Sequence, residues 1–300
     1  MKTAFALLVA AAFVSAPALA QEGTLKKIKD SGSITIGHRD ASIPFSYYDD
    51  KQQPVGYAMD LCLRIVDAVK NDLKMPNLKV NYQLVTSANR IPLMANGTID
   101  LECGSTTNNL ERQKQVWFTI THFVTANRWV AKRSAKLDKL EQLKGKTIVS
   151  TAGTTNIKQM TELNASKNLG MNIISANGHP EAFQMVETGR AAAFAMDDIL
   201  LYSLVAQARN PKDYHISADA TSVEPYGIML RKDDTAFKKV VDAAMVNTYK
   251  SGEINKIYDK WFQKPVPPKG INLNVPMSEQ FKRVVKNPTD SGDPKDYMLQ

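Results

Sequence analysis

Short β-rich runs alternate with amphipathic helical stripes along most of this chain. The run SITIGH (33–38) is typical of a strand, residues 57–73 place apolar side chains at helical spacing, and residues 78–85 are again typical of a strand. A short helix then ends at Gly97, and the strand-like run TIDLEC (98–103) follows. Strands separated by helices in this way pair in parallel within one sheet. The pattern therefore predicts an α/β fold with largely parallel sheets.

The same pattern is repeated later in the chain. A second series begins near Lys139 with LKGKTIVST and continues through helix and strand patterns to RAAAFAM (190–196). Two further β-like runs, 121–133 and 222–232, bracket this series and would carry the chain from one lobe to another and back. About 280 residues would remain after removal of an export signal, which exceeds the size at which one core usually keeps growing. We therefore expect two lobes.

The two bracketing runs set the expected boundaries. Lobe 1 is expected to combine residues 21–126 and 222–285, with two helices that follow the second run completing it. Lobe 2 is expected to comprise residues 127–221. The last segment, 286–300, is rich in Asp, Lys and Pro and is predicted to be a disordered tail.

The first residues have the layout of a secretory signal. Lys2 precedes an unbroken apolar run (4–16), and the small-x-small sequence Ala18, Leu19, Ala20 follows. The apolar run is shorter than the roughly 20 residues that a bilayer span requires. We therefore expect a signal peptide, residues 1–20, and a soluble mature protein that begins at Gln21 and is exported to the periplasm.

The formal net charge of +8 raises the possibility of a nucleic-acid partner. The lysines, however, alternate with acidic residues, as in KLDKLEQLKGK (136–146), and form no basic block. We therefore interpret the charge as a solvated basic surface that could favour anionic ligands, and expect no nucleic-acid partner.

Two cysteines, Cys62 and Cys103, occur in this chain, which we expect to be exported. Cys62 lies on the apolar stripe of the helix predicted at 57–73, so two buried thiols are one interpretation. An oxidising compartment favours the other interpretation, a disulfide between them. Two thiols are too few for a structural zinc site.

Catalytic and cofactor motifs are absent from the sequence. LKGKT resembles the end of a phosphate-binding loop, but Leu140 stands where that loop requires a Gly. The chain has no G-x-S-x-G elbow, H-E-x-x-H helix or G-x-G-x-x-G turn. The four histidines have no metal-ligand spacing: His38, His122, His179 and His215. We expect no cofactor, no metal and no enzymatic activity.

Polar residues follow equivalent strands of the two repeats. Ser105 comes eight positions after Gly97, and Asp197 comes eight positions after Gly189. Both would lie at the carboxyl end of a parallel strand, which is where open α/β sheets bind ligands.

Candidate anion-binding residues lie beside these positions. Ser87, Arg90 and His179 stand at predicted helix starts, whose free N–H groups suit an anion. Arg39 follows the first strand, and Arg112 follows the hydroxyl cluster GSTTNN. Converging arginines indicate a ligand with more than one carboxylate or a phosphate. Asp197 on the other lobe would repel a phosphate but would bind an ammonium group.

Several motifs together resemble a known family. The sequence is similar to periplasmic binding proteins for acidic amino acids, solute-binding protein family 3 of ABC importers, in GHRDASIPFSYYDD, GYAMDL, TAGTTN, RAAAFAMDD, YGIMLRKDD and above all TSANRIPLMANGTIDLECGSTTNNLERQKQ. The resemblance covers nearly the whole mature chain. It implies the type II two-lobed periplasmic-binding-protein fold with two crossover strands, closing on L-glutamate or L-aspartate. A membrane permease would be its partner, and the protein would be a monomer.

The resemblance also implies roles for individual residues. Arg112, with main-chain N–H groups near Thr107 and Thr155, corresponds to the clamp on the α-carboxylate. Asp197, with Ser105 and Thr107, corresponds to the ammonium site.

The remaining residues correspond to the pocket for the ligand's side-chain carboxylate: Arg39, Ser87, Arg90 and His179. Two alternatives stay open at this point. The same fold occurs in dehydratase-like cleft enzymes, although no nucleophile here is paired with a base. A sensor or adhesin that keeps the fold is the other alternative.

Overall fold

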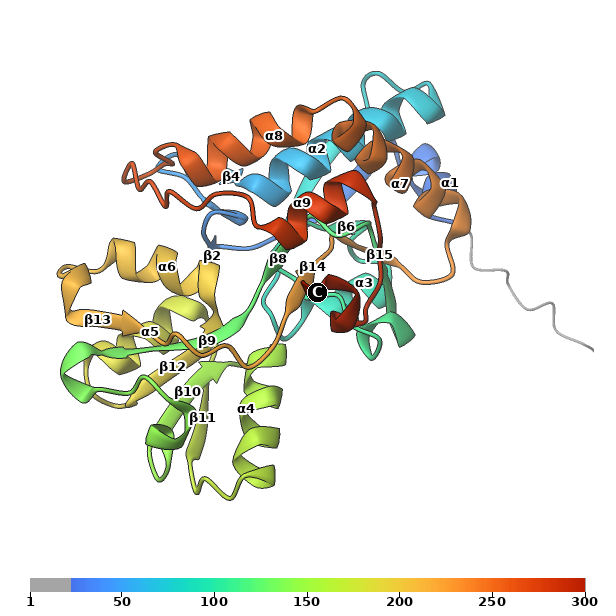
Figure 1. Cartoon of the computed structure of the whole chain (residues 1–300). Helices are drawn as coiled ribbons and strands as arrows, with labels where there is room; N and C mark the ends of the chain where they lie inside the picture. Colours follow the sequence, from blue (N-terminus) through green and yellow to red (C-terminus); the bar gives the residue numbers. More distant parts are fainter. Residues whose placement is uncertain (1–22, 300) are drawn as a thin grey trace, which may run out of the picture.

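The computed structural model describes residues 23–299, so the expected signal peptide, residues 1–20, lies outside the described part of the chain. The chain forms two lobes, each built on a five-stranded sheet, and Figure 1 shows extended strands joining them. The strand order is β5-β1-β6-β15-β7 in the first lobe and β11-β10-β12-β9-β13 in the second. The expected α/β fold is confirmed.

In the first lobe, three parallel strands form one side of the sheet, and two further strands are joined to it by antiparallel pairing. β1 (Ser33–His38) pairs in parallel with β5 (Lys79–Leu84) and β6 (Leu101–Glu102). β15 (Met229–Arg231) pairs antiparallel with β6 and with β7 (Val116–Phe118). The sheet is therefore shared between the N-terminal part of the chain and a segment that returns about 100 residues later.

Helices cover this first sheet, and a small hairpin-like sheet flanks it. The small sheet consists of β2 (Ala41–Ser42), β3 (Ser46–Tyr48) and β4 (Pro54–Val55). The helices are α1 (Thr24–Ser31), α2 (Tyr57–Leu73), α3 (Arg90–Ala95), α7 (Thr235–Lys250), α8 (Glu253–Tyr258), which continues as a π-helix (Asp259–Gln263), and α9 (Glu279–Lys286).

The second lobe repeats the arrangement with its own strands and helices. β10 (Thr147–Thr151) pairs in parallel with β11 (Asn172–Ala176) and β12 (Ala193–Asp197). β9 (Asn127–Lys132) runs antiparallel between β12 and β13 (Tyr214–Ile216). The helices are α4 (Thr155–Ser166), α5 (His179–Glu187) and α6 (Asp198–Gln207).

Two strands carry the chain between the lobes. β8 (Phe123–Thr125) lies within the first predicted bracketing run, β14 (Glu224–Tyr226) lies within the second, and the two strands pair antiparallel. β8 leads almost directly into β9 of the second lobe. The exact lobe boundaries, 21–126, 127–221 and 222–285, stay a prediction.

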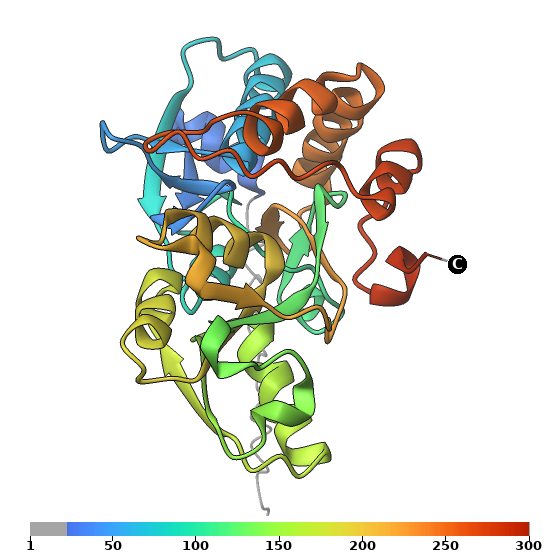
Figure 2. The ribbon, with the colours of Figure 1, turned by 60° about the vertical axis from the view of Figure 1, so that its left-hand side comes forward.

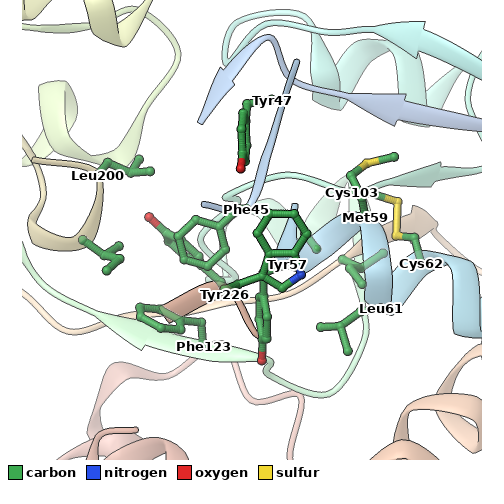
Figure 3. Close-up of a cluster of buried hydrophobic side chains, with 14 of the residues drawn as sticks. Phe45, Tyr47, Tyr57, Met59, Leu61, Cys62, Cys103, Phe123, Leu200 and Tyr226 are labelled. Carbon is green, nitrogen blue, oxygen red and sulfur yellow. A yellow bond between two sulfur atoms is a disulfide. The ribbon is translucent and has the colours of Figure 1, made fainter. Parts of the chain in front are cut away.

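An aromatic cluster fixes the crossing strands to the first lobe. Figure 3 shows Phe45, Tyr57, Phe123 and Tyr226 gathered together, and the Phe45 ring centroid lies 5.0 Å from that of Phe123 and 5.2 Å from that of Tyr226. All four side chains are at most 5% exposed. Because such edge-to-face contacts add to the burial of large apolar areas, the crossing strands are held firmly at their first-lobe end.

Cys62 of α2 and Cys103, which follows β6, form a disulfide (Figure 3). Both residues are fully buried. Of the two interpretations of these cysteines, the disulfide is therefore the one that the structure contains.

The prediction of a disordered tail is wrong for residues 286–299. Lys286 ends α9, and Pro294–Tyr297 form a short 3-10 helix. Tyr297 is only 2% exposed, and its hydroxyl lies 2.8 Å from the Thr121 hydroxyl. The segment is polar on average, but it contains one aromatic residue, Tyr297, whose burial offsets the entropy cost of ordering the chain.

The sequence pattern did not predict helix α6. Its sequence, DILLYSLVAQ, is apolar on several faces and lacks the clear helical stripe of an amphipathic helix. Within residues 23–299, none of the helices combines the length and apolar character needed to cross a bilayer.

Candidate functional site

A small cavity lies between the two lobes. Seven of the nine predicted ligand-binding residues line it: Ser87, Arg90, Ser105, Thr107, Thr155, His179 and Asp197. Thr154, Asn156, Met196 and Leu200 complete the lining. Residues from both repeats of the strand and helix pattern therefore meet at one place.

The two remaining predicted residues, Arg39 and Arg112, do not line the cavity but are buried beside it. Arg39 is 2% exposed and Arg112 is 7% exposed. Burial, and next the charge of Arg90, lower the pKa of each guanidinium to about 10. Both arginines therefore stay charged at neutral pH and add positive potential to the site.

Arg90 is held by a relay that the sequence did not reveal. Its Nη1 atom donates to the Ser105 carbonyl at 3.2 Å and to the Thr106 hydroxyl at 2.6 Å. The Thr106 hydroxyl in turn donates to Glu102 at 2.6 Å. Glu102 is fully buried at the end of β6, and its charge opposes the lowering of the Arg90 pKa by burial. Glu102 thus helps to keep Arg90 charged in a site of low dielectric.

Arg112 connects the two lobes. Its Nη1 atom donates to the Thr107 carbonyl at 2.8 Å, and its Nη2 atom donates to the carbonyl of Gly153 in the second lobe at 3.2 Å. Gly153 has a φ of 75°, and a Cβ there would lie 2.5 Å from the Ala88 Cα. Only glycine permits this close approach, so Gly153 lets the lobes meet at the cavity.

Asp197 is the acidic group of the cavity. It ends β12, accepts a hydrogen bond from Asn156 Nδ2 at 2.8 Å, and accepts a second from the hydroxyl of Tyr226 on a crossing strand. Burial, and next the nearby charge of Glu224, raise the pKa of Asp197 to about 7, although these hydrogen bonds oppose the shift. A cation placed beside Asp197 would stabilise its charged form.

His179 begins α5 and completes the second-lobe wall. Its Nδ1 atom lies 2.8 Å from the Thr151 hydroxyl. Burial, and then the charges of Arg39 and Arg90, hold the pKa of the imidazole well below its ordinary value, so the ring is neutral. If the Thr151 hydroxyl donates to Nδ1, Nε2 carries the proton and can donate into the cavity.

Six buried polar atoms around the cavity have no hydrogen-bond partner within the described protein: Arg39 Nε and Nη1, Ser87 Oγ, Arg90 Nε, Ser105 Oγ and His179 Nε2. Each can donate a hydrogen bond. A buried donor without an acceptor costs roughly 1 to 3 kcal/mol, so this set is suited to a ligand rich in acceptor oxygens. With Asp197 opposite, the site favours a zwitterion that carries an extra carboxylate.

Two residues that contact Asp197 were not predicted from the sequence to belong to the site. Tyr226 lies in a predicted crossover run but was assigned no role, and Asn156 follows the assigned Thr155 by one residue. The Asn156 contact depends on how α4 packs against β12, and the Tyr226 contact depends on where the crossing strand lies, neither of which periodicity alone describes. Within residues 23–299, no cluster of His, Cys, Asp and Glu side chains has the arrangement of a metal site.

Comparison with known proteins gives a consistent result. The model of the bacterial extracellular solute-binding proteins, family 3, matches residues 34–264. The L-glutamate/L-aspartate-binding protein of Pseudomonas aeruginosa is 56% identical over 285 residues, covering 94% of both chains. The glutamate/aspartate import solute-binding protein of Escherichia coli is 47% identical, covering 89% of this chain and 88% of that one. A mutant of ArgBP from T. maritima matches in structure with a TM-score of 0.71 and 26% identity, covering 80% of this chain and 99% of that one.

Proposed function

We propose that this chain, which belongs to the bacterial extracellular solute-binding proteins, family 3, captures L-glutamate or L-aspartate between its two lobes and delivers it to the membrane permease of an ABC importer. The observation that carries the proposal is the set of six unpartnered buried donors in and beside one small cavity that also holds an acidic group. The family and the similar relatives are solute-binding proteins, so the chain is not an enzyme.

The ligand's side-chain carboxylate is assigned to the donor-rich end of the cavity. Ser87, Arg90 and His179 line that end, and Arg39 lies beside it, contributing charge and its own unpartnered donors. A carboxylate offers lone pairs in every direction, whereas an amide turns an NH₂ group toward some of these donors. This end of the site therefore distinguishes acidic from neutral amino acids.

The head group common to all amino acids is assigned to the rest of the cavity. Asp197, with the Ser105 and Thr107 hydroxyls, receives the ammonium group. Arg112 and the main-chain N–H groups near Thr107 and Thr155 receive the α-carboxylate. Since Arg112 already contacts both lobes, a ligand bound here would stabilise the closed arrangement, which is hinge closure around a solute.

The family is extracytoplasmic. The finer proposal is that residues 1–20 direct export to the periplasm and are cleaved. Protein isolated from the periplasm should then begin at Gln21, as peptide mass spectrometry would determine.

One titration series tests the proposed function. L-glutamate or L-aspartate should bind roughly 30-fold to 1,000-fold more tightly than L-glutamine and L-asparagine, because an amide leaves a buried guanidinium poorly paired. Calorimetry on purified protein freed of ligand measures all four affinities and ranks glutamate against aspartate. Equal affinity for acids and amides would contradict the assigned selectivity.

The affinity for glutamate should fall as the pH drops below about 7. The ammonium group requires the Asp197 carboxylate, whose pKa burial and Glu224 raise to about 7, so binding at lower pH must first displace a proton. The expected loss approaches about ten-fold per pH unit and ends where Asp197 titrates in the complex. His179 stays neutral across this range because burial lowers its pKa.

Calorimetric titrations between about pH 5.5 and 8 measure this slope, since free glutamate keeps one net negative charge there. Asp197→Asn is the matched control, because it removes the titrating carboxylate and should remove the slope. A flat profile for the unmodified protein would contradict the assignment of Asp197.

A further inference from the structure

Residues 289–297, here called the C-terminal strap, lie outside the part of the chain that matches the family model. Figure 2 shows this segment at the side of the molecule, after α9 and next to the region of the crossing strands. It is anchored by Tyr297, which is 2% exposed, and by an ion pair of 2.8 Å between Asp290 and Lys238 of α7. The strap is therefore a packed part of the first lobe.

One end of the strap is bound at the entrance to the crossing strands. The Thr121 main-chain N–H, two residues before β8, donates to the Thr289 carbonyl at 2.8 Å. The Tyr297 hydroxyl lies 2.8 Å from the Thr121 hydroxyl and donates to the Ser291 carbonyl at 2.7 Å. These bonds close the strap on itself and fix it to the point where the chain leaves the first lobe.

The middle of the strap holds the loop that carries Thr107 and Arg112. Asn108 Nδ2 donates to the Asp290 carbonyl at 2.8 Å, and Gln113 Nε2 donates to the same carbonyl at 3.0 Å. Asn108 is fully buried and directly follows Thr107 in the sequence. Gln113 is the direct neighbour of Arg112.

The strap and the loop are in close contact at Gly292. A Cβ at Gly292 would lie 2.8 Å from the carbonyl carbon of Asn109 and 2.8 Å from the nitrogen of Leu110. Real Cβ atoms do not approach backbone so closely, so any larger residue would push the strap and the loop apart.

The loop also has contacts that do not involve the strap: the Asn108 N–H donates to the Pro225 carbonyl at 2.7 Å, and the Gly227 N–H donates to the Thr106 carbonyl at 3.1 Å. Residues 103–111 form no helix or strand, apart from an isolated bridge between Thr107 and Tyr226. Loops without regular hydrogen bonding are the mobile parts of a fold unless other contacts order them. In this loop the strap supplies the acceptor carbonyl for the Asn108 and Gln113 side chains, while Thr107 lines the cavity and Arg112 lies beside it.

We infer that the C-terminal strap is a positioning element for the half of the site that binds the α-carboxylate and ammonium groups. The inference rests on the proposed function, since it concerns affinity for an amino acid. By fixing Asn108 and Gln113, the strap holds Thr107 and Arg112 in the binding geometry before the ligand arrives. This preorganisation raises affinity because the loop need not be ordered on binding.

Two variants of the full chain test the inference. Gly292→Ala displaces the strap from the loop, and Tyr297→Phe removes the hydroxyl that ties the strap to Thr121. Each variant should weaken the binding of glutamate and of glutamine by similar factors. The expected loss of affinity is about five-fold to ten-fold for Gly292→Ala and about three-fold for Tyr297→Phe, which is the scale of one or two lost hydrogen bonds.

Matched controls are available in the same lobe. In Gly23→Ala the new methyl group would meet Asp234 Oδ1 at 3.4 Å, an ordinary contact. Tyr258→Phe removes a buried hydroxyl that donates to the Pro276 carbonyl at 3.2 Å, far from the loop along the chain. Both controls should keep the unmodified affinity even if they lower the melting temperature.

A double-mutant cycle separates positioning from general stability. If the strap acts through Arg112, Gly292→Ala should weaken binding less than about two-fold in an Arg112→Met background, yet keep its full effect in an Arg90→Met background. Equal effects in both backgrounds, or unmodified affinity in folded Gly292→Ala and Tyr297→Phe, would overturn the inference. If Gly292→Ala fails to fold, the same cycle with Tyr297→Phe decides. Absence of amino acid binding by the unmodified protein would instead refute the proposed function.

Discussion

Arg90→Met is expected to weaken glutamate binding by about 30-fold to 1,000-fold while weakening glutamine binding much less. The guanidinium is 2% exposed, lines the cavity, and has an Nε atom without a partner in the protein. Removing it leaves a ligand carboxylate buried without its charged donor, which costs roughly 2 to 4 kcal/mol, or about 30-fold to 1,000-fold in affinity. Glutamine carries no charge at that position and loses less.

Arg112→Met is the matched control for this prediction. It removes a cation assigned to the α-carboxylate, which both ligands share, so both affinities should fall by similar factors. Arg90 also donates to Ser105 and Thr106 in the loop, and the loss of those bonds affects both ligands alike. The ratio of glutamate to glutamine affinity therefore isolates the side-chain pocket. Titrations that gave the same ratio for both variants would lead us to abandon the assignment of Arg90.

The positions of the cavity residues could be predicted because they depend on the ends of strands and helices. Ser105 and Asp197 each follow a glycine by eight positions, and in the structure both glycines, Gly97 and Gly189, have positive φ. A residue with positive φ ends each helix and starts the next strand, so equal spacing places the two polar residues at equivalent sheet edges. Local geometry of this kind can be predicted from the sequence.

The relay behind Arg90 could not be predicted in the same way. Glu102 and Thr106 are four positions apart in a segment that is neither a helix nor a continuous strand, because β6 contains only two residues. The bonds of Thr106 to Arg90 and to Glu102 depend on how the loop after β6 packs against α3. Buried polar networks of this kind follow tertiary packing, and the sequence records only that polar residues are present.

The C-terminal segment was also predicted incorrectly, and here the structure is more ordered than the sequence indicates. Composition predicted disorder for 286–300, yet Tyr297 and Gly292 pack closely enough to order the described part of it. One aromatic ring and one close glycine contact do not change an average composition. They do change the free energy of ordering, since a buried tyrosine contributes a large apolar area.

Removing the disulfide should lower the melting temperature by about 8 to 16 °C. Cys62 and Cys103 are 41 positions apart, and on the chain-entropy model a bond closing a loop of this length contributes ~4 kcal/mol by restricting the unfolded chain. For a protein of this size each kcal/mol corresponds to about 2 to 4 °C. The double variant Cys62→Ala, Cys103→Ala, followed by calorimetry or circular dichroism, measures the change.

Reduction of the unmodified protein provides the second arm of this experiment, because it breaks the same bond without changing any side-chain volume by more than the added protons. Both cysteines are fully buried, so the alanine variant also loses packing and should melt slightly below the reduced protein. Glutamate affinity at 25 °C should change little, since the bond joins α2 to the end of β6 behind the cavity and contacts no assigned ligand group. A reduced protein that melted within about 2 °C of the oxidised one would show that the unfolded chain is not appreciably restricted by the bond. A large loss of affinity would instead mean that the bond positions the adjacent loop at Ser105, which lies two residues beyond Cys103.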